Sequence, residues 1–174
     1  MNILNDEFAI VSPIRCGTRW IVGLLWDYLG VDWSKKSPTH SFDLDIMEDR
    51  KVIFIVRNPY KRLRSIFRWE KDIGTIPLDY SWDDFVLNNA YSPIYDSYED
   101  KLSKVHKFVK LENINKEVKN IFNIDLPTYN NEYFDNHVDD GITFEKAYSN
   151  PEYVKRVNKQ FKNDFIHFQY EMLI

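Results

Sequence analysis

The chain has 174 residues, of which 44% are hydrophobic, and this length and apolar content predict one globular domain over residues 1–174. The formal net charge of −4 argues against a general affinity for nucleic acid or for an anionic membrane, because such binding rests on summed basic charge. A site for an anion must therefore be built locally from a few cations.

The sequence also predicts a soluble, cytoplasmic protein. It contains one cysteine, which cannot form an internal disulfide, and its start, MNILNDEFAI, lacks the basic region and the long apolar run of a secretory signal. No apolar run approaches the roughly 18 residues that a membrane-spanning helix needs. We therefore expect no membrane segment.

The first predicted strand is the continuous apolar run Phe8–Val11, which is typical of a strand buried on both faces. A helix is predicted to begin at Thr18 and to end at Gly30, because apolar residues recur at helical spacing between them. The intervening SPIRCGTRW is thus a strand-to-helix turn. It carries two arginines, a glycine and the only cysteine.

The second strand-to-helix unit is the clearest in the chain. Residues 52–56 form an apolar, β-branched strand, and Asn58 and Pro59 then supply a helix cap and a proline at the first helical position. Apolar residues at helical spacing predict the buried stripe of this helix. The charges within residues 61–68 are predicted to form mostly a solvated face.

The rest of the chain continues the alternation of strands and helices, which implies right-handed crossovers and a mainly parallel sheet. We therefore expect an α/β fold of three layers, with helices flanking a mainly parallel central sheet. The remaining elements expected are a short strand at residues 37–42, a helix capped by Ser81, an irregular loop at residues 91–100, a strand at residues 106–111, a helix from about Asn113, and a last helix opened by Asn150 and Pro151.

Both strand-to-helix turns fall at the carboxyl edge of the predicted sheet, where ligands of parallel sheets bind. The first turn joins Gly17 and a helix N-terminus, whose free N–H groups favour an anion, to the cations Arg15 and Arg19. The second places Arg57 at the strand end and Ser65 eight residues later. Two phosphate-sized sites side by side indicate a ligand with separated phosphates.

Two well-known phosphate loops do not match the first turn. A nucleoside triphosphatase loop requires Gly-x4-Gly-Lys-Ser/Thr, but Thr18 stands in place of the lysine and Arg19 in place of the hydroxyl that holds Mg²⁺. A Cys-x5-Arg phosphatase loop fails because the residue six after Cys16 is Val22. We therefore expect the Cys16 side chain to fill space.

Together the two turns resemble the co-substrate motifs of sulfotransferases that use 3′-phosphoadenosine 5′-phosphosulfate (PAPS). RCGTRW is similar to their 5′-phosphosulfate loop, Lys/Arg–Ser/Thr–Gly–Ser/Thr–Ser/Thr–Trp, and VRNPYKRLRS is similar to their 3′-phosphate motif, Val-Arg-Asn/Asp-Pro followed by a serine at the eight-residue spacing. PTHSF resembles the Thr-His element of cytosolic members. Other segments resemble landmarks of the carbohydrate-type branch, namely SWDDFV, VKLENI, DLPTYNN and DFIHFQY.

The resemblance implies a P-loop nucleoside-triphosphatase-like sulfotransferase fold and a role for each matched residue. Arg15 would contact the bridging or sulfuryl oxygens, and His40 would be the general base on the acceptor hydroxyl. Arg57 and Ser65 would bind the 3′-phosphate. Trp20 would either stack on the adenine or pack in the core. The residues that would cradle the 5′-phosphate are Cys16, Gly17, Thr18 and Arg19.

The implied chemistry needs no metal. Sulfuryl transfer places less negative charge on the moving group than phosphoryl transfer does, so cationic side chains and helix N–H groups can replace Mg²⁺. A histidine with a pKa of about 6.5 accepts a proton at neutral pH. Arg15 stands where the family usually has a lysine. The sequence departs from the family at Cys16 and Arg19, which replace small hydroxyl residues, and at Pro38, which replaces the lysine before Thr-His.

We therefore expect an enzyme that moves a sulfuryl group from PAPS to a hydroxyl or an amine of a small-molecule or saccharide acceptor. Residues between Asp72 and Lys104 would help to line the acceptor cleft. Two alternatives stay open, a small Mg²⁺-dependent nucleotide or metabolite kinase and a non-catalytic protein that binds an adenosine bisphosphate. The sequence chooses neither the acceptor nor the oligomeric state.

Overall fold

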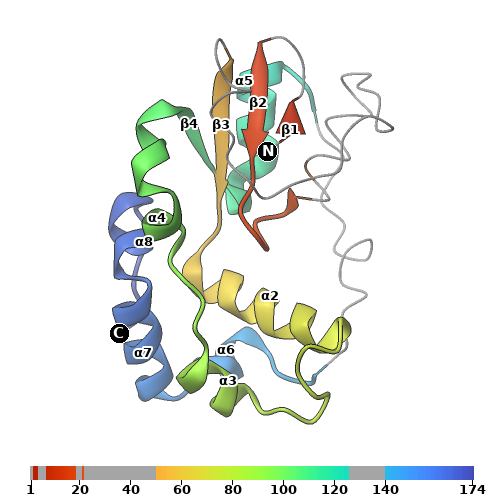
Figure 1. Cartoon of the computed structure of the whole chain (residues 1–174), viewed down its shortest axis with the longest axis vertical. Coiled ribbons are helices and arrows are strands. Elements are labelled where there is room, and N and C mark those ends of the chain that lie inside the picture. Colours follow the sequence, from red (N-terminus) through yellow and green to blue (C-terminus); the bar gives the residue numbers. More distant parts are fainter. Residues whose placement is uncertain (1, 4–6, 19–20, 22–49, 126–139) are drawn as a thin grey trace. The chain divides into compact units, whose positions relative to one another are not determined.

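A computed structural model describes residues 2–3, 7–18, 21, 50–125 and 140–174 (Figure 1). The chain forms two compact units. The first comprises Met1–Arg57 and Tyr98–Asn130, and the second comprises Asn58–Ser97 and Asn131–Ile174. The single domain expected over residues 1–174 stays a prediction.

The first unit is built on a sheet with the strand order β1-β2-β3-β4 (Figure 1). β2, β3 and β4 are parallel to one another, whereas the short β1 pairs antiparallel with β2. This confirms the α/β class and the mainly parallel sheet, and it adds an edge strand that the sequence did not indicate. The strands are Asn2–Ile3 (β1), Phe8–Val11 (β2), Lys51–Val56 (β3) and Val105–Lys110 (β4).

The burial of β3 explains its sequence. It is paired on both sides, and all its side chains after Lys51 are buried. A strand covered on both faces needs an apolar side chain at every position, which accounts for the uninterrupted run VIFIV. Among the described strands β4 ends the order and pairs with β3 alone, and most of its side chains are partly or fully exposed.

Helices frame the ends of β2 and β4 in the first unit. A helix begins at Thr18, and the N–H of Ile21 donates to the Gly17 carbonyl over 3.0 Å in its first turn. The predicted helix end at Gly30 and the strand expected at residues 37–42 lie outside the described residues. α5 covers one face of the sheet, where Phe122 meets Phe8 edge-on with ring centres 5.0 Å apart. The helical segments around β4 are η2 (Glu99–Lys104), η3 (Leu111–Asn113) and α5 (Ile114–Phe122).

The second unit is helical in its described residues. α2 (Pro59–Asp72) begins at the predicted cap, where the Asn58 side chain accepts from the N–H groups of Tyr60 and Lys61 over 3.0 and 3.3 Å. Ser81 and Asn150 likewise cap their helices as predicted. No helix of the described residues is long and apolar enough to cross a membrane. The other helices are α3 (Trp82–Asn88), α4 (Ile94–Tyr98), α6 (Phe144–Ala147), α7 (Pro151–Gln160) and α8 (Lys162–His167).

An aromatic core holds the second unit together. The ring centre of Phe67 lies 5.4 Å from that of Trp82 and 5.0 Å from that of Phe85. On the C-terminal side, Phe165 lies 5.1 Å from Tyr60. The last helical segment, which was predicted as one helix, breaks into α7 and α8 at Phe161, and its apolar residues at helical spacing are buried: Val154, Val157, Phe161, Phe165 and Phe168.

The expectation of an irregular loop at residues 91–100 is wrong, because α4 and the start of η2 lie there. A distant side chain explains the helix. Asp164 of α8 accepts from the N–H groups of Ile94 and Tyr95 over 2.9 and 2.7 Å and so supplies the cap that the local sequence lacks. Burial raises the pKa of Asp164, and these two hydrogen bonds offset only part of that rise.

Replacing Phe67 by alanine tests whether the aromatic core supports the second unit. Phe67 is fully buried, so Phe67→Ala should lower the free energy of unfolding by about 3–5 kcal/mol in urea denaturation followed by circular dichroism. Leu87→Ala on α3 is the control, since Leu87 is 47% exposed and its loss should cost about 0.5 kcal/mol or less. Equal losses in the two variants would contradict the packing described here.

Candidate functional site

The carboxyl ends of the parallel strands meet at one edge of the sheet in the first unit. Val11 pairs with Phe54, and Val56 pairs with Lys110, so the three strands end on the same side. The residues that follow are Ser12 after β2, Arg57 after β3 and Leu111 after β4. This edge carries the first predicted phosphate loop and the arginine of the second motif.

A relay of hydroxyl groups closes the loop of residues 12–17 on itself. The Thr18 hydroxyl donates to Ser12 Oγ over 2.9 Å, and the Ser12 hydroxyl donates to the Cys16 carbonyl over 3.1 Å. The N–H of Cys16 also donates to the Pro13 carbonyl over 3.0 Å, which forms a tight turn. Ser12 is fully buried, and sequence reasoning missed its role although a hydroxyl directly after a buried strand was a usable signal.

Two residues of the loop have left-handed backbone conformations. Arg15 has φ +62° and Gly17 has φ +79°. Glycine adopts this conformation without a steric penalty, whereas an L-residue with a side chain loses roughly 1–2 kcal/mol there. Strain of this kind is retained where the surroundings enforce it, and it is common at binding sites. Arg15 is therefore a residue whose backbone must be held by other groups.

Gly17 and Cys16 pack the loop against the rest of the first unit. A Cβ atom on Gly17 would lie 2.6 Å from Leu111 Cδ1, so the absence of a side chain lets the segment after β4 approach the loop closely. The Cys16 side chain is fully buried. Leu111 is a second residue that sequence reasoning missed, because its contact with Gly17 joins positions far apart in the chain.

A hydrogen bond joins the two predicted phosphate motifs. Arg57 Nη1 donates to the carbonyl oxygen of Arg15 over 3.0 Å. Both residues are partly buried, and both belong to the first unit. The structure thus brings together Arg15 and Arg57, with Cys16, Gly17 and Thr18 in the same loop.

Ser65 lies on α2 in the second unit and is 9% exposed. The Val-Arg-Asn-Pro segment has the local structure that its sequence predicts: the strand ends at Val56, Asn58 caps the helix, and Pro59 opens it. The pairing of Ser65 with Arg57 at one phosphate stays a prediction. Arg19, Trp20 and His40 lie outside the described residues, and their roles also stay predictions.

The expected solvated face of α2 is wrong for two of its arginines. Arg62 and Arg64 are 5% and 6% exposed. Arg62 donates to the Ser92 carbonyl over 3.2 Å, and Arg64 donates to the Ile142 carbonyl over 2.8 Å and pairs with the buried Asp140 carboxylate. These hydrogen bonds, made inside the second unit, offset part of the hydration that the two guanidinium groups lose on burial.

Asp140 is the acidic partner of this buried pair. Burial by itself would raise the pKa of its carboxyl group, but hydrogen bonds from Arg64 and from the N–H of Ile142, together with the charges of Arg64 and Arg68, hold the pKa below its usual value. Asp140 is therefore ionised at neutral pH and neutralises an arginine. The charge of Arg64 is committed to the core of the second unit.

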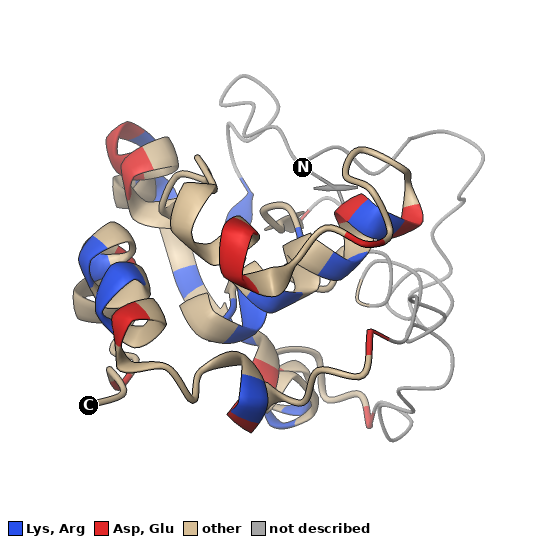
Figure 2. Ribbon diagram, turned by 90° about the horizontal axis from the view of Figure 1, so that it is seen from below, with Lys and Arg blue, Asp and Glu red and all other residues tan. Residues whose placement is uncertain are grey.

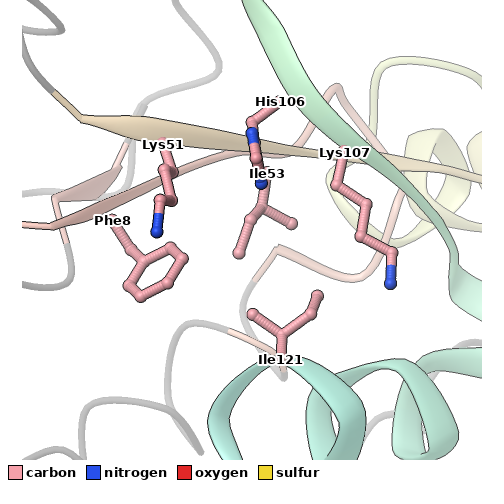
Figure 3. A pocket seen from close by; sticks show the side chains of 6 residues that line it. All are labelled: Phe8, Lys51, Ile53, His106, Lys107 and Ile121. Atoms are coloured by element: carbon pink, nitrogen blue, oxygen red, sulfur yellow. The ribbon is translucent and has the colours of Figure 1, made fainter.

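A hollow lies at the opposite, amino-terminal edge of the same sheet (Figure 3). Its two lysines are already neutralised, because Lys51 pairs with Glu7 and Lys107 pairs with Glu117, each over 2.7 Å. Its charge balance therefore gives no preference for an anion. The lining side chains are those of Phe8, Lys51, Ile53, His106, Lys107 and Ile121.

Lysine and arginine positions are spread over several elements of the described chain, together with acidic positions (Figure 2). What distinguishes the loop edge is therefore its construction rather than its total charge. In the part of the chain that the structure describes, no group of three or more His, Cys, Asp or Glu side chains is placed to hold a metal ion. Comparisons with protein-family models, with curated proteins and with solved structures found no match.

The contact between Gly17 and Leu111 can be tested by a double-mutant cycle. Gly17→Ala should cost about 1–2 kcal/mol of stability for the left-handed backbone, plus the displacement of Leu111, as measured by urea denaturation. In a Leu111→Ala background the second cost should disappear.

Gly74→Ala is the matched control. Gly74 has φ +73°, but a Cβ atom there meets nothing within 4 Å. Gly74→Ala should therefore lower the free energy of unfolding only through the left-handed backbone. If Gly17→Ala costs the same with and without Leu111, the close approach contributes nothing to stability.

Proposed function

We propose that this chain is a PAPS-dependent sulfotransferase that transfers a sulfuryl group to a hydroxyl or an amine of a small-molecule or saccharide acceptor. The observation that carries the proposal is the 3.0 Å hydrogen bond from Arg57 to the Arg15 carbonyl. It joins, at one sheet edge, an arginine from each of the two motifs whose order and spacing resemble the co-substrate motifs of that family. A ligand with phosphates at both ends of an adenosine suits that arrangement.

The loop of residues 12–17 supports the 5′-phosphosulfate end of the proposal. A buried strand leads through a turn containing a left-handed glycine into a helix that starts at Thr18. The first N–H groups of a helix have no partner within the helix and favour an anion. Arg15 adds a cation at the position where the resemblance places a contact to the bridging or sulfuryl oxygens. Cys16, Gly17, Thr18 and Arg19 would cradle the 5′-phosphate.

The proposed fold is the three-layer, P-loop nucleoside-triphosphatase-like sulfotransferase fold. The parallel strands β2, β3 and β4 and the strand-turn-helix at residues 8–21 support it. The Asn58 cap and the Pro59 start of α2 support the second motif in the same way, because they give Val-Arg-Asn-Pro its strand-to-helix geometry. In this proposal Arg57 and Ser65 bind the 3′-phosphate, and Trp20 stacks on the adenine.

The proposed reaction is an in-line displacement at sulfur. The acceptor oxygen forms a bond to sulfur while the bond between sulfur and the bridging oxygen of PAPS breaks, and the products are a sulfate ester and 3′,5′-adenosine bisphosphate. His40 takes the proton that the acceptor hydroxyl loses. Arg15 and the loop N–H groups stabilise the charge that develops on the leaving phosphate. The residues present supply cations where a kinase would use Mg²⁺.

Calorimetric titration tests the nucleotide preference directly. The protein should bind 3′,5′-adenosine bisphosphate equally well with and without Mg²⁺, because the proposed contacts are side-chain cations and backbone N–H groups. Binding of ATP should be weaker by at least about tenfold, because ATP has no 3′-phosphate for Arg57 and Ser65. A hydrogen bond to a charged group is worth on the order of 1.5–3 kcal/mol. Tight binding of ATP only in the presence of Mg²⁺, with no binding of the bisphosphate, would replace this proposal with a kinase.

Turnover of PAPS separates an enzyme from a non-catalytic binder of adenosine bisphosphate. With an acceptor from a panel of saccharides, phenols and small alcohols, His40→Ala should lower kcat by about 10²- to 10⁴-fold while bisphosphate affinity stays unchanged. His106→Ala is the matched control, because His106 lies on β4 in the hollow at the opposite edge. Full activity of His40→Ala would remove His40 from the role of base. Bisphosphate binding without turnover of any acceptor would favour the binder.

A further inference from the structure

We propose that Arg57 is a positioning residue for the loop of residues 12–17, in addition to the ligand contact assigned to it above. The bond that does this runs from Arg57 Nη1 to the Arg15 carbonyl over 3.0 Å. Arg57 follows directly on β3, the strand paired on both sides, so its backbone is among the best anchored at this edge. A fixed cation thereby holds the backbone of a neighbouring loop.

The loop needs such an anchor at this residue. Arg15 has φ +62°, a conformation that disfavours residues with a side chain, so without an external partner this segment would relax toward ordinary backbone angles. A hydrogen bond from a charged donor is stronger than a neutral one and is suited to offset that strain. The carbonyl that accepts it immediately precedes Cys16, whose N–H closes the turn on Pro13.

The guanidinium geometry allows both roles at once. It carries five N–H donors in a planar fork, and the bond to the Arg15 carbonyl uses one of them. Other donors of the same group can reach an anion while this bond persists. Arg57 should therefore strengthen binding of ligands that lack a 3′-phosphate, because it keeps the 5′-phosphosulfate loop in shape. A residue that contacted only the 3′-phosphate would have no such effect.

The thiol of Cys16 can report on the opening of this loop. Cys16 is the only cysteine of the chain and is fully buried, so its thiol reacts with a reagent only when the loop opens. In labelling with 5,5′-dithiobis(2-nitrobenzoate), the thiolate attacks the reagent disulfide, forms a mixed disulfide and releases one thionitrobenzoate, which is followed by absorbance. Arg57→Gln should raise the labelling rate about tenfold or more, and Arg57→Lys should raise it less, since lysine keeps a charged donor.

Two further variants make this measurement specific. Arg15→Asn keeps the carbonyl and suits a left-handed backbone, so the effect of Arg57→Gln should persist in that background if the carbonyl is what Arg57 holds. Arg156→Lys on α7 is the matched control and should leave the rate within twofold of the wild type. Should Arg57→Gln fail to fold, Arg57→Lys carries the test. Rates within twofold of the wild type for every folded Arg57 variant would overturn the inference.

Measurements of nucleotide binding by Arg57→Lys connect the inference to the proposed function. Only these binding measurements depend on that proposal. Arg57→Lys should weaken both adenosine 3′,5′-bisphosphate and adenosine 5′-phosphosulfate, the latter by about fivefold or more, although it has no 3′-phosphate. If only the bisphosphate is weakened, Arg57 acts on the 3′-phosphate alone and the positioning role is lost. If the wild type binds neither nucleotide, the proposed function fails, and the Cys16 labelling rates still decide the role of Arg57.

Discussion

The parallel pairing of β2, β3 and β4 is the constraint on which the rest of the first unit depends. Parallel strands end on the same side, so residues 12, 57 and 111 come to one edge although the chain separates them widely. Two contacts of the loop of residues 12–17 depend on this proximity. Arg57 reaches the Arg15 carbonyl from the end of β3, and Leu111 reaches Gly17 from the end of β4. Without this pairing the loop would lose both the hydrogen bond from Arg57 and the packing contact with Leu111.

Two arginines of the described residues, Arg57 and Arg64, differ in what their positive charge interacts with. Arg64 pairs with a buried carboxylate and also donates to a carbonyl, so its charge is neutralised within the second unit. Arg57 donates to a backbone carbonyl, which carries only a partial charge, so most of its positive charge is left for other interactions. Counting cations along the sequence could not separate Arg57 from Arg64, because the decisive factor is the partner that each arginine meets.

Local signals in the sequence predicted the elements well. Continuous apolar runs predicted β2 and β3, and Asn58, Ser81 and Asn150 marked the helix starts, because a cap satisfies backbone N–H groups within one turn of chain. The failures are those in which a distant residue decides the outcome. α4 depends on Asp164 from α8, and Arg64 is buried by its partner Asp140.

In the candidate site, too, the sequence predicted the features set by nearby residues and not those set by distant ones. The spacing of its motifs identified the loop and Arg57, since both follow recognisable strands. The sequence did not predict that Arg57 bonds to the Arg15 carbonyl, that Ser12 closes the loop, or that Leu111 packs on Gly17. Each of these contacts needs the three-dimensional register of neighbouring strands, and periodicity within one segment carries no information about that register.

The left-handed backbone of Arg15 has a consequence for how this position evolves. Folding by itself favours glycine or asparagine at a φ of +62°, whereas the proposed function calls for a cation at residue 15, so under that proposal the two requirements oppose each other. A library of variants screened for folding alone would drift away from arginine at this position. Under the proposed function, a library screened for binding of adenosine 3′,5′-bisphosphate would retain arginine there.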